Sequence, residues 1–252
     1  MSNEATSLEF SIVIPVYNEA ENIEPMVREI QAAFDGRSEA YEVIFVDDAS
    51  SDDSPAVLQR LTLETSGVVR SLRHRRNFGQ SAAVATGFRA ARGGWVGTLD
   101  GDGQNDPADL PHMLDEARRL KVDCVTGVRA KRQDNFIRKL SSRVGNGFRN
   151  WATGDRVTDS GCGVRVVRAA CVGELPVFNG LHRFMPTLLR SKGYVVAEHP
   201  VNHRPRLRGV SKYGVHNRLW RGIRDCFGVR WFAARAVPAE RVESARGPGQ
   251  GR

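Results

Sequence analysis

Short apolar runs alternate with longer segments of helical spacing over the first 130 residues, and this alternation constrains the fold more than any other feature. The runs FSIVIPVY (10–17) and YEVIFVDD (41–48) are rich in β-branched and aromatic residues, which is typical of strands. The segment between them repeats apolar residues every three or four positions, which predicts a helix. These positions are Ile23, Met26, Val27, Ile30 and Phe34.

The same pattern recurs as far as residue 128. Strands that alternate with helices of about ten residues or more imply βαβ units and a mainly parallel sheet. Near-continuous apolar runs fit strands that are buried on both faces. The predicted fold class is therefore α/β, with helices flanking a mainly parallel, Rossmann-like sheet. Strands are predicted at 10–17, 41–48, 67–74, 94–100 and 122–128, and helices at 18–34, 51–61, 79–92 and 106–120.

Residues beyond 130 alternate less regularly. They predict helices at 138–152 and 179–193, with a short strand at 162–168 between them. We expect this half to elaborate the same domain rather than to form a second independent one.

Composition narrows the class of protein. A chain of 252 residues, 40% of them hydrophobic, is long enough for one large domain. Its first ten residues lack the order of a signal peptide, and no apolar run approaches the roughly 18 residues that cross a bilayer. The four cysteines have no C-x-x-C spacing, so we expect small buried side chains in a reducing cytoplasm rather than a zinc site or disulfides.

The net charge of +8 is divided unevenly along the chain. Residues 1–60 hold three Lys or Arg against thirteen Asp or Glu, whereas residues 201–252 hold twelve basic and three acidic side chains. A basic C-terminal half predicts an anionic partner: a nucleoside diphosphate, a phospholipid surface or a nucleic acid. Few aromatic residues are interleaved with the basic ones, so no nucleic-acid partner is expected.

Polar clusters follow three of the predicted strands: PVYNE, VDDASSDD and LDGDGQND. In an open parallel sheet, ligands bind outside the carboxyl ends of the strands. All three clusters are therefore expected to converge on one crevice.

The cluster after the fourth strand brings Asp100, Asp102 and Asp106 close together. Two unit charges about 4 Å apart repel by about 4 kcal/mol at an effective dielectric constant near 20, and an anionic diphosphate would add to this repulsion. A divalent cation reverses these signs, and Mg²⁺ or Mn²⁺ binds carboxylates together with substrate phosphates and water. The alternative is that the carboxylates cap the next helix, as Asp106 before Pro107 could do. Three acidic groups at one crevice favour the metal.

The other two clusters are ambiguous on their own. Asp47 and Asp48 could be turn or capping residues, or one carboxylate could accept N–H groups of a nucleotide base. Tyr17 could stack on a base, and Asn18 could cap the helix that follows it.

Four segments together resemble the inverting glycosyltransferases of family 2, which have the nucleotide-sugar-binding GT-A fold: IVIPVYNEAENI, VIFVDDASSDDS, RNFGQSAAVATGFRAARG and TLDGDGQNDPADLP. The later segments VTGVR, TDSGCGVRVVRA, LHRFMPTLL and RLRGVSKYG are similar to one branch, the polyprenyl-phosphate (dolichyl-phosphate) sugar synthases. The resemblance implies a GT-A domain over 10–232, with a donor-binding half at 10–130 and an acceptor-side half at 131–232. A polar extension at 1–9 and a disordered tail at 233–252 would flank it.

The resemblance also implies roles for individual residues. In that family the first motif contacts the nucleotide, the second binds the base, and a D-x-D-x-Q pattern holds Mg²⁺ or Mn²⁺ with the donor diphosphate. The family often has Ala where Gly101 stands, and we expect that exchange to be harmless. The residues implied are Pro15, Tyr17 and Glu19 for the nucleotide; Val46 and Asp48 at the base; Asp100, Gly101, Asp102 and Gln104 for the metal and diphosphate; Arg129, Arg206 and Lys212 for phosphate groups; and Arg138 with Ser142 for the acceptor phosphate.

Asp159 in TDSGCGVR is the second catalytic candidate beside Asp102, because the wider family can use it as a general base. A sugar hydroxyl is a poor nucleophile and needs such a base. A lipid phosphate, with a second pKa near 6, is already nucleophilic at neutral pH. With a lipid phosphate acceptor, Asp159 is expected instead to orient Arg165 or the acceptor.

Residues 213–232 predict an amphipathic basic helix. Such a helix can lie in a membrane interface with its arginines on anionic head groups, or dock on the core as an ordinary surface helix. Many relatives carry transmembrane helices after this point, so we expect peripheral attachment to the cytoplasmic face, which a membrane-protein partner could assist. The predicted apolar arc holds Val215, Leu219, Ile223, Cys226 and Phe227 with Trp220 at its edge, and the basic side holds Arg218, Arg221 and Arg224.

The predicted activity is metal-dependent, inverting transfer of a hexose (mannose or similar) from a GDP- or UDP-linked sugar to a polyprenyl phosphate. Transfer to a glycan hydroxyl in cell-surface polysaccharide synthesis is the alternative. A phospho-accepting receiver domain is disfavoured because the chain extends well beyond five strands. A phosphatase aspartate loop is disfavoured because the acidic pair follows the fourth strand rather than the first.

Overall fold

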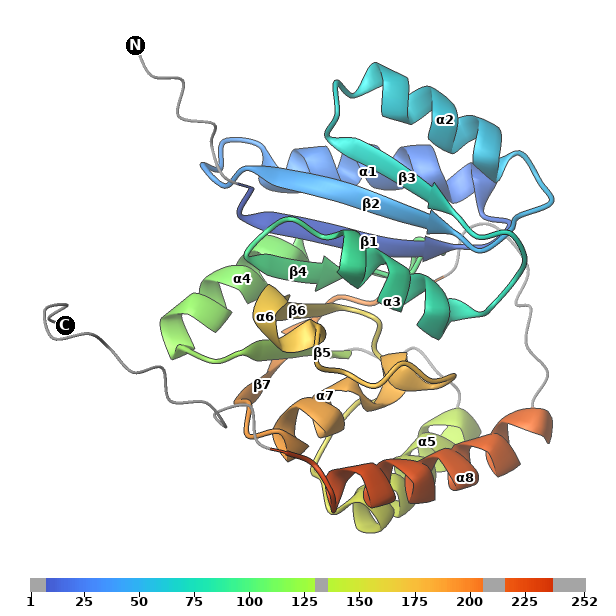
Figure 1. Cartoon of the computed structure of the whole chain (residues 1–252), viewed down its shortest axis with the longest axis vertical. Helices are drawn as coiled ribbons and strands as arrows, with labels where there is room; N and C mark the ends of the chain where they lie inside the picture. Colours follow the sequence, from blue (N-terminus) through green and yellow to red (C-terminus); the bar gives the residue numbers. More distant parts are fainter. Residues whose placement is uncertain (1–7, 130–135, 206–215, 238–252) are drawn as a thin grey trace, which may run out of the picture.

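One seven-stranded sheet runs through the computed structural model, which describes residues 8–129, 136–205 and 216–237 (Figure 1). Its strand order is β3-β2-β1-β4-β6-β5-β7. Neighbouring strands are parallel except for β6, which is antiparallel to both β4 and β5. The strands are β1 (Phe10–Val16), β2 (Tyr41–Asp47), β3 (Val69–Arg73), β4 (Trp95–Thr98), β5 (Cys124–Arg129), β6 (Arg165–Arg168) and β7 (Val196–Val201).

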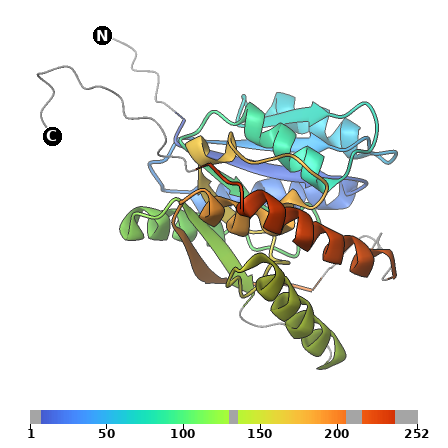
Figure 2. The same ribbon diagram turned by 60° about the horizontal axis from the view of Figure 1, so that its bottom comes forward.

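Helices cover both faces of this sheet. Helices α1, α2 and α4 pack on one face, and α3, α6 and α7 pack on the other. Helices α5 and α8 pack against each other beyond α7, at the end of the molecule away from α2 (Figures 1 and 2). The helices are α1 (Ala20–Phe34), α2 (Ser54–Glu64), α3 (Gln80–Ala90), α4 (Asp109–Leu120), α5 (Phe136–Thr153), α6 (Ala169–Val172), α7 (Leu181–Ser191) and α8 (His216–Ala233).

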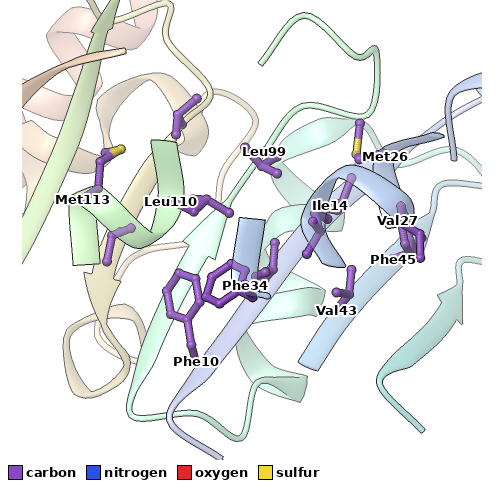
Figure 3. Close-up of a cluster of buried hydrophobic side chains, with 14 of the residues drawn as sticks. Phe10, Ile14, Met26, Val27, Phe34, Val43, Phe45, Leu99, Leu110 and Met113 are labelled. Carbon is purple, nitrogen blue, oxygen red and sulfur yellow. The ribbon is translucent and has the colours of Figure 1, made fainter. Parts of the chain in front are cut away.

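Alternation of side chains along the strands divides the core into two layers. In β1, Ile12 and Ile14 face α1 and α4, whereas Val13 between them faces α3 and α7, and all three are fully buried. Figure 3 shows the first layer, in which the rings of Phe10 and Phe34 lie 5.7 Å apart. Because burying one such side chain contributes roughly 1.5–3 kcal/mol, β1 anchors the strand ends that carry the site.

The predicted α/β class and mainly parallel sheet are confirmed. Every strand and helix predicted before residue 130 is present, with ends that differ by a few residues. Helix α6 and strand β7 were not predicted. Strand β7 pairs with β5 at the edge of the sheet, and most of its side chains are partly exposed, so no continuous apolar run marks it.

Helix α8 buries a narrower face than the predicted arc. Cys226 and Val229 are buried in the second core layer, whereas Phe227 is 52% exposed. Phe227 lies about 100° around the helix from Cys226, and packing on α5 and α7 covers only one strip of the arc. The predicted apolar arc therefore divides into a strip that docks on the core and a part, including Phe227, that stays exposed. Val215 lies outside the described residues, and at Arg218, Leu219, Trp220 and Arg221 the structure describes only the backbone.

Three further expectations concern the whole chain. Among the described residues, no helix combines the length and the apolar character that crossing a membrane requires. All four cysteines are buried and free of disulfides, as predicted. The limits of the domain and of its two halves stay predictions, and residues 1–7 and 238–252 of the terminal segments lie outside the described residues.

Candidate functional site

The carboxyl ends of β1, β2 and β4 open into a cavity of about 390 Å³, which we call the acidic cavity. The three polar clusters of the sequence meet here, as predicted. In the lining that the structure describes, four carboxylates face one guanidinium, so the cavity repels an anion in the absence of a cation. The predicted site residues that line it are Pro15, Tyr17, Glu19, Asp48, Asp100, Gly101, Asp102, Gln104 and Arg129.

The loop after β1 is tied to the loop after β2, and this connection fixes one wall of the acidic cavity. The Asn18 backbone N–H donates to Ser50 Oγ (2.8 Å), and the Ser51 N–H donates to the side-chain oxygen of Asn18 (2.7 Å). Asn18 has a φ of 53°, which Asn tolerates better than most residues. Its side chain joins two loops rather than capping α1, whose N-cap is Glu19.

Asp100 is a carboxylate of the acidic cavity whose pKa is clearly raised. Burial and the adjacent Asp102 carboxylate raise the pKa of Asp100 to about 6, although Arg165 and a hydrogen bond from Gln80 act in the opposite direction. Gln80 Nε2 donates to Asp100 Oδ1 (2.7 Å), and the Asp100 N–H donates to Asn105 Oδ1 (2.8 Å). The carboxylate is thus positioned by α3 and by its own loop. A cation bound there would stabilise the charged form that the protein alone disfavours.

The two other acidic residues of the loop, Asp102 and Asp106, have different positions and contacts. Asp102 accepts the Gln104 N–H (3.1 Å) and lines the acidic cavity. Asp106 does not line it: this carboxylate accepts the Ala108 N–H (3.1 Å) before α4 and pairs with Arg204 (2.8 Å). Of the three crowded carboxylates, Asp100 and Asp102 line the acidic cavity. Asp106 instead bonds the backbone at the start of α4, which was the alternative role for this cluster.

Two glycines permit close approaches at this loop. A Cβ at Gly163 would lie 2.2 Å from Asp100 Oδ2, so only glycine leaves room for that carboxylate. A Cβ at Gly101 would lie 2.7 Å from the Pro15 carbonyl oxygen and 2.9 Å from Val16 Cγ1. An Ala at position 101 would therefore require a shift of this backbone, because the Pro15 carbonyl of β1 cannot yield freely. The expectation that Gly in place of the family's Ala is harmless stays a prediction.

Asp48 lines the acidic cavity but is already engaged in the protein. Its Oδ1 accepts the Phe78 N–H (2.9 Å) and lies 2.7 Å from His74 Nδ1, and its Oδ2 accepts the Gly79 N–H (2.7 Å). These bonds hold the start of α3, where Gln80 reaches Asp100. Asp48 therefore helps to position Asp100 through the start of α3 and Gln80, a role that sequence reasoning did not foresee.

Arg129 and Asp159 form a two-bond pair at the edge of the acidic cavity. Arg129 Nε donates to Asp159 Oδ2 (2.6 Å) and Nη2 donates to Oδ1 (2.7 Å). Asp159 is 5% exposed and also accepts the Gly161 N–H (3.2 Å). This geometry satisfies both carboxylate oxygens and orients the Arg129 guanidinium. With a lipid phosphate acceptor, Asp159 was expected to orient Arg165 or the acceptor; the structure pairs it with Arg129 rather than Arg165, and a contact with the acceptor stays a prediction.

A second cavity of about 870 Å³ adjoins the first at Asp100 and the 161–163 segment. We call it the basic cavity, because its lining holds Arg165, Arg183 and Arg224 against Asp100 and Asp225. It lies between α3, α7 and α8 on the side of the second core layer.

Arg165 is the unusual residue of the basic cavity. It is 3% exposed, and its Nε has no hydrogen-bond partner in the part of the chain that the structure describes. Arginine is rarely buried this far unless it is paired. Sequence reasoning gave it no binding role, but a signal exists: in VRVV, Arg165 occupies a position that alternation assigns to the buried side of a strand.

Other predicted residues fall outside either lining or outside the described part of the chain. Val46 is fully buried in the second core layer and does not line either cavity. Arg206 and Lys212 lie outside the described residues. Arg138 and Ser142 belong to α5, in a stretch of that helix where only the backbone is described.

The donor set suits a divalent cation that shares its ligands with a substrate. Asp100, Asp102 and Gln104 supply oxygen atoms at one loop, and burial together with the Asp102 carboxylate raises the Asp100 pKa, a shift that a bound cation would oppose. Within the described ranges, no group of three or more His, Cys, Asp or Glu side chains is placed to hold a metal. Two carboxylates and an amide fit Mg²⁺ or Mn²⁺ completed by phosphates and water better than a cage made by protein alone.

Comparison with known proteins identifies the family. Residues 11–169 match the family described as Glycosyl transferase family 2. The chain is 36% identical over 231 residues to dodecaprenyl-phosphate galacturonate synthase of Rhizobium johnstonii, covering 90% of this chain and 68% of that protein. It is 35% identical over 215 residues to undecaprenyl-phosphate 4-deoxy-4-formamido-L-arabinose transferase of Edwardsiella ictaluri, covering 85% and 66%. The chain thus spans about two thirds of the length of these relatives.

Solved structures agree on the fold. A mannosyltransferase from Pyrobaculum calidifontis in complex with GDP-Man and Mn²⁺ superposes with a TM-score of 0.60 at 21% identity, covering 92% of this chain and 65% of that one. Glucosyl-3-phosphoglycerate synthase from Mycobacterium tuberculosis with Mn²⁺ and UDP-glucose gives 0.63 at 16% identity, covering 92% and 81%. The fold is therefore the GT-A fold. With the acidic D-x-D loop at the carboxyl ends of its strands, the chain belongs to glycosyl transferase family 2 and is a glycosyltransferase.

Proposed function

We propose that this enzyme transfers a hexose, with inversion, from a nucleoside diphosphate sugar to the phosphate of a polyprenyl phosphate, and that it needs Mg²⁺ or Mn²⁺. The observation that carries the choice of acceptor is the Arg129–Asp159 pair. A hydroxyl acceptor requires a base, and the base candidate Asp159 has both oxygens committed to a guanidinium. A phosphate acceptor needs no base at neutral pH.

The donor belongs in the acidic cavity. Tyr17, which is 38% exposed just after β1, would stack on the nucleotide base, and Pro15 and Glu19 line the same cavity. This nucleotide base is the guanine or uracil of a GDP- or UDP-linked sugar. The diphosphate reaches Asp100, Asp102 and Gln104 only together with a divalent cation, because the carboxylates would otherwise repel it.

Each protein group has a definite task in the transfer. When bound, the divalent cation neutralises the diphosphate and stabilises the charge that develops on the leaving group. Gln80 holds Asp100 in place, and Arg129, oriented by Asp159, presents its guanidinium to a phosphate oxygen. Asp102 is catalytic in this scheme through the metal, and Asp159 positions Arg129 rather than removing a proton.

The names of the relatives support the acceptor class. The relatives from Rhizobium johnstonii and Edwardsiella ictaluri are named for dodecaprenyl phosphate and undecaprenyl phosphate. Transfer to a glycan hydroxyl remains the second candidate. It is favoured only by the presence of Asp159 where other family members can place a base.

Four predicted contacts belong to the same proposal. Arg206 and Lys212 would close over the donor phosphates, and Arg138 with Ser142 would approach the acceptor phosphate from α5. The location proposed is the cytoplasmic face of the membrane, with peripheral attachment through α8. Exposed Phe227, Trp231 and Phe232 beside exposed arginines of that helix support attachment to anionic lipid, with or without a membrane-protein partner.

A donor panel with radiolabelled sugars tests this function. GDP- and UDP-linked sugars are incubated with extracted polyprenyl phosphate, with and without Mn²⁺, and the label is followed into the organic phase. We expect one donor to yield an acid-labile, organic-soluble product only in the presence of the cation. Label that enters a water-soluble glycan instead would favour the hydroxyl acceptor.

The variant Asp102→Ala sharpens that test. It is expected to lower turnover by at least about a hundredfold with an unchanged circular dichroism spectrum, because it removes one of two metal carboxylates. Asp115→Ala, on the exposed face of α4, is the matched control and should retain activity. Near-normal turnover by Asp102→Ala, or by a chelator-treated enzyme, would remove the metal from the proposal.

A further inference from the structure

The basic cavity is not used by the nucleotide, the diphosphate or the cation in the proposed function. We propose that Arg165 and Arg183, with Arg224 at the rim, form the cradle that binds the phosphate monoester of the acceptor. The inference rests on the proposed function and assigns the acceptor phosphate to these arginines in addition to Arg138 and Ser142 of α5.

Arg165 and Arg183 both line this cavity. Arg165 is 3% exposed, and among the described residues neither its Nε nor the buried Nε of Arg183 has a hydrogen-bond partner. Burying guanidinium donors without partners is unfavourable, so their retention around a large cavity indicates an anionic ligand. The planar guanidinium matches phosphate oxygens with two parallel hydrogen bonds.

The charges that face these arginines leave the cavity positive. Asp225 Oδ2 lies 3.7 Å from Arg183 Nη2, too far for a good hydrogen bond, and it offsets part of one charge. Asp100 is shared with the acidic cavity, where Gln80 and the proposed cation engage it. His182 is held through Nδ1 by Ser81 Oγ (2.8 Å). A dianionic phosphate therefore finds a net attraction here that a neutral hydroxyl does not.

The position of the cradle also suits an inverting reaction. The two cavities meet at Asp100 and the 161–163 segment, so a sugar at this junction has the leaving diphosphate on one side and the basic cavity on the other. The acceptor oxygen forms its bond to the anomeric carbon from the basic cavity. The bond from that carbon to the nucleoside diphosphate breaks, and its electron pair leaves with the diphosphate. No proton is transferred, because the acceptor phosphate is already ionised.

Helix α8 indicates that this phosphate carries a hydrocarbon chain. Phe227 and Trp231 follow Arg224 at spacings of three and seven residues, so the three lie on the same side of the helix. Phe227 is 52% and Trp231 is 55% exposed. An apolar track therefore leads away from the arginine at the rim of the basic cavity, as a lipid phosphate requires and free phosphate does not.

Binding of geranyl phosphate, a short soluble polyprenyl phosphate, tests the cradle directly by calorimetry at pH 8. Arg183→Gln and Arg165→Lys are each expected to weaken its binding by about tenfold or more, and Arg224→Gln by a few fold because it is exposed. Arg230→Gln, another exposed arginine of α8 that does not line the cavity, is the matched control and should bind normally. Geraniol should not bind, and inorganic phosphate should compete only weakly.

The outcomes separate the cradle from the acceptor class. If the unaltered protein does not bind geranyl phosphate, the polyprenyl phosphate acceptor itself is wrong. If it binds and Arg183→Gln binds equally well, the acceptor class stands and the cradle is wrong. If Arg183→Gln loses affinity for GDP or UDP with Mn²⁺ in the same proportion, the arginines serve the donor and the cradle is overturned. Should Arg165→Lys fail to fold in a thermal melt, Arg183→Gln decides the question alone.

Discussion

Asp100 shows at the scale of one residue how function opposes stability in this site. The folded chain raises its pKa from 3.8 to about 6, so the folded protein binds this proton more tightly than the unfolded chain does. The resulting stabilisation is fully present below pH 3.8 and is lost as the pH rises through 6. At neutral pH the metal-free protein therefore carries an unfavourable charge that the cation is expected to relieve.

Asp100→Asn is expected to stabilise the metal-free protein at pH 7.5 while abolishing transfer. The amide keeps the acceptor for Gln80 and removes the charge, a gain on the order of 1–3 kcal/mol, reduced by the partial exposure of this side chain. Thermal melts at pH 7.5 and pH 5 check this, because the advantage should shrink at pH 5, where the native carboxyl is itself protonated. A lower melting temperature at pH 7.5, or intact turnover, would contradict the assignment.

Gly163→Ala tests the close approach of Asp100 from the other side. Because a Cβ there would lie 2.2 Å from Asp100 Oδ2, the carboxylate must move, and we expect turnover and Mn²⁺-dependent nucleotide affinity to fall by about tenfold or more. Gly173→Ala, where a Cβ would meet nothing within 4 Å, is the control. Equal activities of the two variants would show that Asp100 is not held where the transfer requires it.

Single residues of the site could be predicted only as far as local patterns reach. Asp100 and Asp102 follow a strand within three residues, so strand periodicity placed them at the crevice. Asp159 pairs with Arg129, which lies 30 residues away in the sequence. No local pattern shows that Asp159 pairs with Arg129 rather than with Arg165. The cost of a side chain at Gly101 depends on the Pro15 carbonyl of a different strand, which no motif records.

At the scale of elements, the start of α3 links the end of β2 to the loop after β4. Asp48, at the end of β2, accepts two backbone N–H groups at residues 78 and 79. Gln80, the first residue of α3, then holds Asp100 beside β4. The ends of β2 and β4 are therefore coupled through the start of α3.

Asp48→Asn is expected to loosen this connection. Its amide group would oppose a backbone N–H, leaving a buried donor unsatisfied at a cost of about 1–3 kcal/mol, with weaker donor binding as a consequence. Melting temperature and the affinities for GDP and UDP with Mn²⁺ measure the two effects, and Asp53→Asn, at an exposed position before α2, is the control. If Asp48 instead reads the base directly, the ratio of GDP to UDP affinity changes while the melting temperature stays constant.

Strands with both faces buried could be predicted from the sequence, whereas β7, at one edge of the sheet, could not. Strands β1 and β2 read as continuous apolar runs because helices cover both of their faces. Strand β7 is half exposed, and the antiparallel direction of β6 depends on the path of the chain through α5, so neither followed from periodicity. The basic cavity lies between α3, α7 and α8, and its residues come from six separate segments.

At the scale of the whole molecule, the uneven charge of the sequence becomes an arrangement of two sites and a surface. The acidic first half supplies the carboxylates of the acidic cavity, and the second half supplies the arginines of the basic cavity and of α8. Trp151 of α5 (69% exposed) and Trp231 of α8 add large apolar side chains to the two helices that pack together at the end of the molecule (Figure 2). Sequence periodicity predicted this amphipathic helix with Phe227 on its apolar arc, but a helical wheel does not show which strip of that arc a neighbouring helix covers.

Sedimentation with vesicles tests whether this end of the molecule contacts the membrane. Vesicles of phosphatidylcholine with about a third phosphatidylglycerol should bind the protein, and binding should weaken as salt is raised because the arginines contribute electrostatically. The double variant Phe227→Ser/Trp231→Ser is expected to bind several fold more weakly, since two exposed aromatic side chains no longer enter the interface. Leu63→Ser, at a 79% exposed position on α2, removes an apolar side chain from a surface with no such role and should leave binding unchanged. If the double variant sediments with vesicles as well as the unaltered protein does, α8 is an ordinary surface helix, and the lipid acceptor must reach the basic cavity by another route.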